Sequence, residues 1–318
     1  MLSILIPTYN YVCVKLVTDL QQQAERLECP YEKLVTDLQQ QAERLECPYE
    51  ILVADDASED AFKRENRKIN GIPNCKYIEL QENVGRSRIR NILGRLARYD
   101  YLIFMDCDAS VVSNEFLSRY MAVRNAAEVV YGGLVHPEQL PSPKVSLAFF
   151  YEKHAEPHFT AEKRALHPYK VFRTFNFMIL RETFLKHPFD ETITHYGHED
   201  TLFGLVLKKE GIKILHIDNP LMNCGLDTNR NVLRKTEESL RTLYVHRDKL
   251  ERSSGVHRLY GTLQRLHLVL FVSLLYRLCR PMIRRNLYSR HPNLYFFAFY
   301  KVGYYCSLFD KNNSLVNQ

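Results

Sequence analysis

The sequence lacks three features that would each indicate a particular kind of protein. None of its eight cysteines forms a Cys-x-x-Cys pair, which excludes the commonest zinc and thiol-redox motifs and fits a reducing compartment. No basic leader precedes residues 2–7, which already have the composition of a buried strand, so no signal peptide is expected. The uncharged apolar run at 266–276 would form about 16 Å of helix, too short for a hydrocarbon core of about 30 Å. We therefore expect a cytoplasmic location.

Acidic residues are missing from most of the C-terminal region, because none occurs between Glu251 and Asp310. Residues 246–318 contain 12 Lys and Arg against 3 Asp and Glu, whereas residues 1–245 contain 31 against 34. The sequence thus predicts a body at 1–245 and a basic, aromatic-rich helical tail at 246–318. Arginines interleave with Leu, Tyr and Phe in residues 255–306, a pattern typical of amphipathic helices that lie on an anionic membrane, here peripheral to its inner face.

Two other roles for the tail have to be weighed. Its helices would also suit a cover over the body's own apolar surface. Nucleic acid is not expected as a partner, because the apolar runs are too rich in Leu and Phe for a face that follows phosphates.

Two carboxylates follow a short apolar stretch in the middle of the body. Residues 101–105 are apolar or aromatic and too few for a helix, which indicates a buried strand of a parallel sheet. Asp106 and Asp108 come directly after it, and ligands bind at the carboxyl ends of strands in open α/β sheets. Such a pair can share a hard divalent cation that keeps positions open for phosphates. An ordinary turn, in which Asp is common, is the alternative for the tripeptide alone.

Strand and helix patterns alternate through the body. Strands are predicted at residues 2–7, 51–54, 75–80, 129–134 and 174–179, and helices at 86–97 and 201–209. Such alternation gives right-handed βαβ units, so we expect an α/β fold with a Rossmann-like, mostly parallel sheet flanked by helices. The strands at 2–7, 51–54 and 101–105 would then present polar residues at one edge of the sheet.

One segment is duplicated without change, since residues 15–32 recur as residues 33–50. Within each copy, Leu and Ala at spacings of four and three fall on one helical face, and Cys-Pro-Tyr ends the segment because proline cannot continue a helix. A repeat architecture needs three or more units, so we interpret the pair as a recent slip or an assembly or cloning artefact. We expect two short helices joined near Pro30, one packed on the sheet and the other exposed.

Six short motifs follow one another along residues 3–200. They are SILIPTYN at 3–10, LVADDAS at 52–58, NVG at 83–85 with Arg90 and Asn91, MDCD at 105–108, FDE at 189–191 and YGHED at 196–200. In this order they resemble the motifs of family 2 glycosyltransferases, and the resemblance covers roughly residues 1–245. It implies the GT-A fold of nucleotide-diphospho-sugar transferases and an inverting transfer reaction.

The resemblance also assigns roles to the matching residues. The nucleotide would be bound by a set comprising Pro7, Thr8, Tyr9, Asp55, Asp56, Arg90 and Asp106. Asp106 and Asp108 match the family's Asp-x-Asp, which contacts the ribose and the diphosphate-bound Mg²⁺ or Mn²⁺. Asp200 matches the catalytic base and Glu199 would position the acceptor, although acids in a first helical turn also suit the helix dipole.

The implied chemistry needs these parts. A divalent cation neutralises charge on a leaving diphosphate, and a carboxylate one hydrogen bond from the acceptor hydroxyl removes its proton. One base without a dedicated nucleophile fits direct displacement, which inverts the anomeric centre. The expected donor is a UDP-sugar or another nucleotide-sugar. The expected acceptor is a glycan or a lipid-linked glycan in polysaccharide biosynthesis.

Two positions depart from the family's pattern. His198 stands where relatives often carry Trp as a platform for the acceptor sugar, which puts the acceptor's identity in doubt. Asn223 stands where many relatives place a metal-binding His, and its amide oxygen suits Mg²⁺ better than a transition metal. His216 is a substitute ligand or, as we favour, a buried structural histidine.

Two other functions are alternatives. Asp106 and the residues after it also resemble the aspartyl nucleophile motif of haloacid-dehalogenase-like phosphatases, but that motif belongs to a first strand near the N-terminus. The departures at His198 and Asn223, with the duplication, also fit a catalytically degenerate, membrane-associated protein that binds a sugar nucleotide or a glycan.

Overall fold

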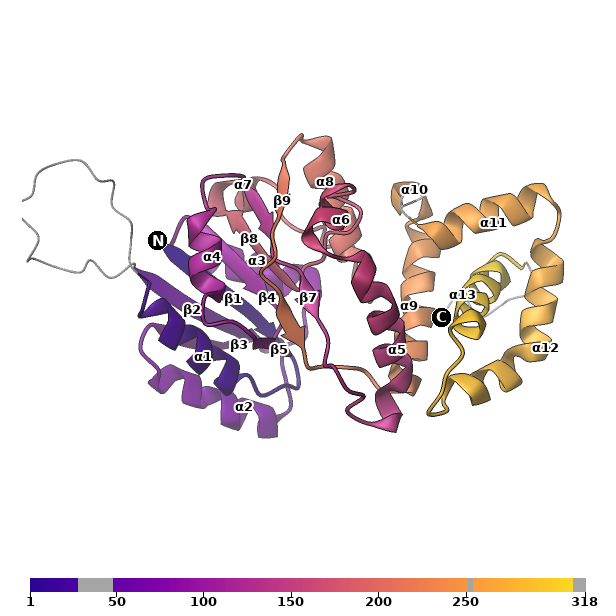
Figure 1. Cartoon of the computed structure of the whole chain (residues 1–318), viewed down its shortest axis with the longest axis horizontal. Coiled ribbons are helices and arrows are strands. Elements are labelled where there is room, and N and C mark those ends of the chain that lie inside the picture. The colour runs from indigo at the N-terminus through magenta and orange to yellow at the C-terminus, as the bar shows by residue number, and fades with distance from the viewer. Residues whose placement is uncertain (28–47, 251–253, 311–318) are drawn as a thin grey trace, which may run out of the picture. The chain divides into compact units, whose positions relative to one another are not determined.

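The computed structural model describes residues 1–27, 48–250 and 254–310 (Figure 1). These residues form two compact units, each assembled from segments that are distant in the sequence. Unit 1 comprises residues 1–134, 173–189 and 210–222. Unit 2 comprises residues 135–172, 190–209 and those from 223 onward, so these units do not follow the predicted division at residue 245.

Unit 1 is built on a seven-stranded sheet in the order β3-β2-β1-β4-β8-β6-β9. The strands are β1 (Leu2–Thr8), β2 (Tyr49–Asp55), β3 (Cys75–Glu79), β4 (Tyr101–Met105), β6 (Val129–Tyr131), β8 (Asn176–Leu180) and β9 (Ile214–His216). Neighbours among β1 to β4 pair in parallel, as do β6 and β9, whereas β8 runs antiparallel to β4 and β6. The predicted α/β fold with a mostly parallel sheet is confirmed.

The register of the central strands aligns their carboxyl ends. Thr8 at the end of β1 lies opposite Asp55 at the end of β2, and Leu5 of β1 lies opposite Phe104 of β4. Nearly every residue of these three strands is buried, as expected for strands covered on both faces. Asp106 follows β4 directly, so the polar residues that end the three strands gather at one edge of the sheet, as predicted.

The connections of unit 1 are mostly helical. They are α1 (Val14–Ala24), α2 (Asp60–Asn66), the 3₁₀ helix η1 (Arg67–Gly71), α3 (Arg86–Leu96), α4 (Phe116–Ala122) and α7 (Arg181–Lys186). A small sheet in the order β5-β10-β7 joins β5 (Ala109–Val111), β10 (Leu221–Asn223) and β7 (Leu134–Val135).

The first copy of the duplicated segment supplies the packed helix that was predicted. Leu16, Leu20 and Ala24 of α1 are buried in the core of unit 1. Most of the second copy, and with it the predicted second helix near Pro30, lies at residues 28–47, outside the described residues. Its last two residues begin β2, which therefore starts at Tyr49 rather than at residue 51.

Unit 2 is largely helical. Its helices are η2 (Pro143–Val145), α5 (Ser146–Ala155), η3 (Glu156–His158), α6 (Ala161–Ala165), α8 (Glu199–Lys209), α9 (Asn229–Val245), α10 (Arg247–Leu250), α11 (Gly255–Arg265), α12 (Val269–Leu287) and α13 (Leu294–Leu308). The predicted helices of the tail are thus present. Phe297 and Tyr300, which lie in the range 255–306 predicted to face a membrane, are instead buried within unit 2. With Tyr304, at spacings of three and four, they form the buried stripe of α13.

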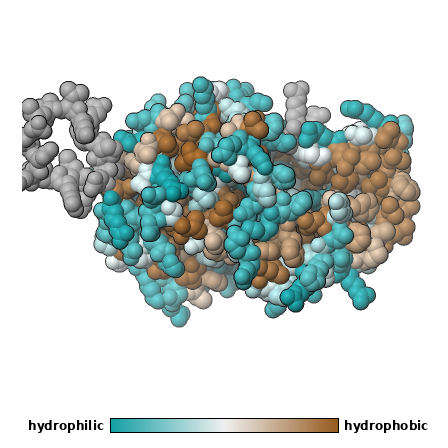
Figure 2. Space-filling model, viewed as in Figure 1, coloured by the Kyte–Doolittle hydropathy of each residue, from teal (hydrophilic) through white to brown (hydrophobic). Residues whose placement is uncertain are grey.

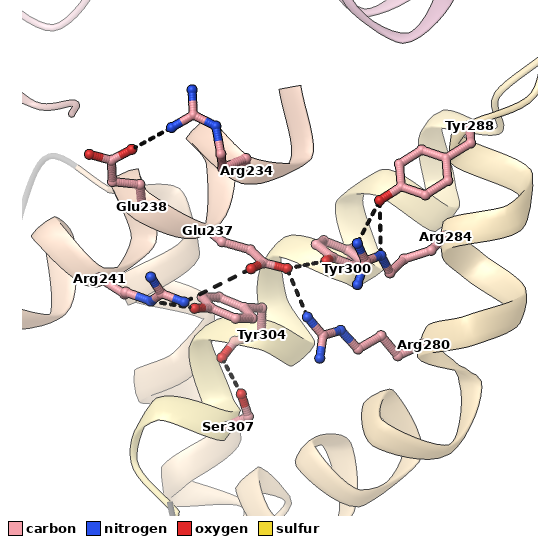
Figure 3. Close-up of polar contacts among 10 residues, drawn as sticks. All are labelled: Arg234, Glu237, Glu238, Arg241, Arg280, Arg284, Tyr288, Tyr300, Tyr304 and Ser307. Carbon is pink, nitrogen blue, oxygen red and sulfur yellow. Dashed lines mark hydrogen bonds and ion pairs between the residues drawn. The ribbon is translucent and has the colours of Figure 1, made fainter. Parts of the chain in front are cut away.

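A polar network fixes α9, α12 and α13 to one another (Figure 3). Glu237 of α9 accepts hydrogen bonds from Arg280 of α12 (3.1 Å) and from the hydroxyl of Tyr300 of α13. Arg241, one turn further along α9, donates from Nε to the hydroxyl of Tyr304 (2.7 Å). Charge-assisted hydrogen bonds of this kind set which side of each helix faces the core of unit 2.

Candidate active site

Hydrogen bonds join the loops that follow β1 and β2. The N–H of Asp56 donates to the carbonyl of Thr8 (2.9 Å), and the N–H of Asn10 donates to the hydroxyl of Ser58 (2.7 Å). Pro7 is half-buried, whereas the ring of Tyr9 is 53% exposed beside this edge. An exposed aromatic face next to a strand end suits stacking of a nucleotide base.

Asp55 holds this edge together from inside. Its side chain is fully buried, and its two oxygens accept hydrogen bonds from the N–H of Ser58 (2.7 Å) and the hydroxyl of Tyr77 (2.6 Å). Both contacts shape the loop after β2. The predicted contact of Asp55 with the nucleotide stays a prediction.

Asp56 links the end of β2 to the turn before α3. Its carboxylate accepts hydrogen bonds from the N–H groups of Val84 (2.7 Å) and Gly85 (3.0 Å). Burial raises the pKa of Asp56, although the two peptide donors favour the ionised form. Gly85 has a φ of +82°, a conformation that non-glycine residues rarely adopt, so the turn enters α3 in a defined direction.

Arg90 of α3 holds the first carboxylate of the Asp-Cys-Asp motif. Its side chain is 3% exposed, and Nη2 donates to Oδ1 of Asp106 at 2.7 Å. The guanidinium carbon lies 5.8 Å from the ring centre of Phe189, and Nε is a buried atom without a hydrogen-bond partner in the part of the chain that the structure describes. Arg90 therefore orients Asp106 directly, a contact that the predicted role at the nucleotide did not include.

The Asp-Cys-Asp residues fit a hard cation. They form the turn between β4 and β5, where the side chain of Asp106 is 29% exposed and Asp108 is half-buried. Burial, followed by the nearby Asp108 carboxylate, raises the pKa of Cys107 to about 12, so its thiol stays protonated at neutral pH, and the oxygens of the two aspartates are the ligands that a hard cation prefers. Among residues 1–27, 48–250 and 254–310, no group of three or more His, Cys, Asp or Glu could hold a metal ion. A cation here would need ligands from a diphosphate and water as well.

The two predicted catalytic residues begin α8 in unit 2. Glu199 is 8% exposed and Asp200 is half-buried. The N–H of Thr201 donates to Oδ1 of Asp200 at 2.6 Å, which fixes the direction of the carboxylate. The helix starts after Gly197 and His198, whose φ angles are +99° and +72°. This double left-handed turn sets where Glu199 and Asp200 lie relative to the rest of unit 2.

The turn is bound to α9. Thr242 donates its hydroxyl to the carbonyl of Tyr196 (3.1 Å), and the N–H of Tyr196 donates to Glu238 (3.1 Å). A Cβ at Gly197 would lie 2.6 Å from the hydroxyl oxygen of Ser239 and 2.8 Å from its Cβ. Only glycine fits between this loop and α9 at that φ.

A cavity of about 390 Å³ lies beside His198 within unit 2. Its lining includes the rings of Tyr151 and Tyr196, together with Lys235 and Lys301. The His198 ring shares a hydrogen bond with the hydroxyl of Ser239 (3.2 Å). Burial lowers the pKa of His198, partly offset by Glu199, so the neutral imidazole prevails at neutral pH. Aromatic and polar groups of this kind suit a sugar.

Lys301 brings the C-terminal helix α13 to this cavity. Its Nζ lies 4.6 Å from the ring centre of Tyr151 and 4.8 Å from that of Phe297, and it donates to the hydroxyl of Tyr151 (3.2 Å). Part of the predicted tail therefore lines the same cavity as the YGHED motif.

The two departures from the family pattern have separate places. Asn223 lines the cavity beside His198, and its Oδ1 accepts a hydrogen bond from the N–H of Gly225 (3.0 Å). His216 of β9 is 8% exposed and packs edge-on against Tyr131, with 5.4 Å between ring centres. That burial suits the structural role that we favoured for His216. A metal-binding role for either residue stays a prediction.

Residues 3–187, more than half of the chain, match the family model described as Glycosyl transferase family 2. The chain belongs to this family. It is a glycosyltransferase that transfers a sugar from a nucleotide-sugar donor, as the resemblance implied. The phosphatase and the catalytically inactive binding protein are therefore set aside.

One solved structure agrees with this assignment in fold. The glycosyltransferase is similar to mannosyltransferase PcManGT from Pyrobaculum calidifontis in complex with GDP-Man and Mn²⁺, with a TM-score of 0.57 and 13% identity over 98% of this chain and 87% of that one. For S. aureus TarS 1-349 in complex with UDP-GlcNAc, the TM-score is 0.49 and the identity 15%, over 96% and 90% of the chains. No curated protein matches the chain.

Sequence motifs do not reveal the residues that hold the candidate site residues of the glycosyltransferase in place. Tyr77 contacts Asp55 across 22 residues of sequence, and Ser239 contacts His198 across 41. Lys301, which lines the cavity beside His198, belongs to α13 near the C-terminus. No local motif marks such partners, because only the folded chain brings them near.

Proposed function

We propose that this glycosyltransferase inverts the anomeric centre as it moves a sugar from a UDP-sugar, or another nucleotide-diphospho-sugar, to a hydroxyl of a glycan or lipid-linked glycan in polysaccharide biosynthesis. The observation that supports this best is the in-register alignment of β1, β2 and β4. It gathers Thr8, Asp56 and Asp106 at one edge of the sheet. Ligands of α/β folds bind at such an edge.

The residues proposed to bind the donor belong to unit 1. A nucleotide base has the exposed ring of Tyr9 on which to stack, and the ribose and diphosphate would follow toward Asp106. Mg²⁺ or Mn²⁺ held by Asp106 and Asp108 would neutralise the charge that develops on the leaving diphosphate. Arg90 supports this arrangement because its ion pair keeps Asp106 in one orientation.

The residues proposed to act on the acceptor belong to unit 2. In the proposed step the acceptor oxygen forms a bond to the anomeric carbon while the bond to the diphosphate breaks, and Asp200 takes the hydroxyl proton. The hydrogen bond from Thr201 holds Asp200 for this role. The acceptor sugar would lie in the cavity beside His198, against Tyr151 and Tyr196, with Lys301 donating to it. Glu199, at the start of the same helix, would position the acceptor.

Calorimetric titration with UDP tests the proposed nucleotide site, with and without Mn²⁺, on the wild type and on Asp108→Asn. GDP is titrated in parallel, because the similar mannosyltransferase is in complex with GDP-Man and Mn²⁺. We expect one of the nucleotides to bind with metal and Asp108→Asn to remove the dependence on metal. The control is Asp248→Asn, which replaces an exposed carboxylate of α10 and should bind like the wild type.

Transfer is followed as release of the nucleotide diphosphate from the sugar donor that binds. Asp200→Asn should keep donor affinity and lose at least about a hundredfold in turnover, since general-base catalysis contributes about 10² to 10⁴. Unchanged turnover in Asp200→Asn would exclude it as the base. If the affinity for the favoured nucleotide changes neither on addition of Mn²⁺ nor in Asp108→Asn, the proposed metal site is excluded.

A further inference from the structure

Helix α12 presents a face of large apolar side chains to solvent (Figure 2). The exposed fractions are 68% for Leu270, 62% for Phe271, 58% for Leu274, 72% for Leu278 and 57% for Met282. Spacings of four place Leu270, Leu274, Leu278 and Met282 on one side of the helix, over about 18 Å. Continuous exposed apolar patches on a soluble fold mark interaction sites.

The opposite side of α12 is firmly packed, so this exposure does not come from a loose helix. Tyr276 and Ile283 are each 2% exposed in the core of unit 2. Arg280 reaches inward to Glu237 of α9, the contact at the centre of Figure 3. A Cβ at Gly303 of α13 would lie 2.5 Å from the Cβ of Tyr276, which shows how closely the two helices approach.

Positive charge borders the apolar face at both ends. Arg285 is exposed three residues after Met282 and so continues the stripe, and Arg265 is exposed just before α12 begins. No acidic residue occurs in the sequence from 252 to 309. Apolar side chains flanked by exposed arginines complement the surface of a bilayer, where anionic headgroups lie over apolar acyl chains.

We propose that the α12 face binds the surface of an anionic lipid bilayer, with its Leu, Phe and Met side chains at the acyl boundary and Arg265 and Arg285 on lipid phosphates. Among the described residues, no single helix is long and apolar enough to cross a membrane, and α11 and α12 pass such a test only as a pair bent by 119°. A face that lies along the interface needs no crossing. A second copy is a poorer occupant, because pairing two such faces brings like charges together.

Cosedimentation with vesicles tests the proposal on the full chain. Vesicles of phosphatidylcholine alone are compared with vesicles that also contain phosphatidylglycerol. The wild type should bind the mixed vesicles more tightly. Leu274→Gln with Leu278→Gln should weaken binding at least about tenfold, since both side chains leave the acyl boundary. Arg265→Gln with Arg285→Gln should reduce the preference for phosphatidylglycerol.

The matched control is Leu166→Gln with Leu96→Gln, which changes two exposed leucines outside α12 (74% and 48% exposed) and should bind like the wild type. Circular dichroism of each variant establishes that it is folded. Vesicle binding that survives Leu274→Gln with Leu278→Gln overturns the proposal, and so does a wild type that binds neither vesicle. A dimer in sedimentation velocity that this variant dissociates, without vesicle binding, would assign the face to a second copy instead.

Discussion

Replacing Gly197 by alanine should disturb the residues proposed to act on the acceptor and leave those proposed to bind the nucleotide intact. Gly197 has a φ of +99° and sits against Ser239 of α9, one residue before His198 and the start of α8. A Cβ there would meet the Ser239 hydroxyl oxygen at 2.6 Å, its Cβ at 2.8 Å and its Cα at 3.3 Å. The last two atoms belong to a helix that cannot easily move, so the loop itself has to shift.

The magnitude follows from two separate costs. A residue with a side chain forced into such a backbone conformation costs about 1–3 kcal/mol. Overpacking against a fixed neighbour costs about 1–3 kcal/mol more. We therefore expect Gly197→Ala to lower the free energy of unfolding by about 2–6 kcal/mol. The loss of stability will be smaller if the loop shifts and displaces Glu199 and Asp200. Displacement of a catalytic carboxylate by about 1 Å can reduce turnover about a hundredfold.

Urea denaturation and nucleotide titration together check this expectation. Gly261→Ala is the control, because that position lies within α11 with no atom within 4 Å of the added Cβ, and it should gain up to about 1 kcal/mol. Gly197→Ala should also keep wild-type affinity for the nucleotide, whose proposed site is in unit 1. Wild-type stability and turnover in Gly197→Ala would refute the view that the fit against α9 positions the acidic pair.

Three further changes test individual side chains. Burial lowers the pKa of His198 below its usual value of 6.5, so the unfolded chain binds a proton that the folded chain does not. Stability should therefore fall as pH drops below about 6.5, by at most about 1.4 kcal/mol per pH unit. His198→Asn, which tolerates the positive φ, should flatten that slope in urea titrations at several pH values. Lys301→Met should raise the KM for the acceptor about tenfold without changing the affinity for the donor. The control Lys213→Met should change neither quantity. The same KM for the acceptor in both variants would exclude a contact between Lys301 and the acceptor. Arg90→Lys should weaken Mn²⁺-dependent nucleotide binding about tenfold by titration, since lysine cannot reproduce the buried guanidinium contact to Asp106, and unchanged binding would contradict that role.

The parts of the fold that the sequence predicted correctly depend on local patterns. The apolar run at 101–105 is too short and too continuous for anything but a buried strand, and the carboxylates after it end the strand. The antiparallel course of β8 was not predicted, because strand direction depends on pairing with β4 and β6, which are distant in sequence. The sequence also could not decide whether α13 packs in the core of unit 2 or lies on a membrane, since its aromatic residues suit both environments.

The candidate site divides in the same way. The motifs located Asp106, Asp108, Glu199 and Asp200 by position, but not the partners that orient them. Arg90 was placed at the nucleotide, and only the structure shows its 2.7 Å contact with Asp106. Likewise, nothing in the sequence around YGHED marks a left-handed turn at His198, because packing against α9 imposes it.

Helix α9 connects the two inferences about unit 2. One side of it, through Glu238, Ser239 and Thr242, holds the loop that leads to Asp200. Another side, through Glu237, holds α12 by way of Arg280. The apolar face of α12 and the loop before α8 are thus attached to the same 17-residue helix. The orientation of the proposed lipid-binding face of α12 and that of the loop before the proposed base Asp200 therefore both depend on α9.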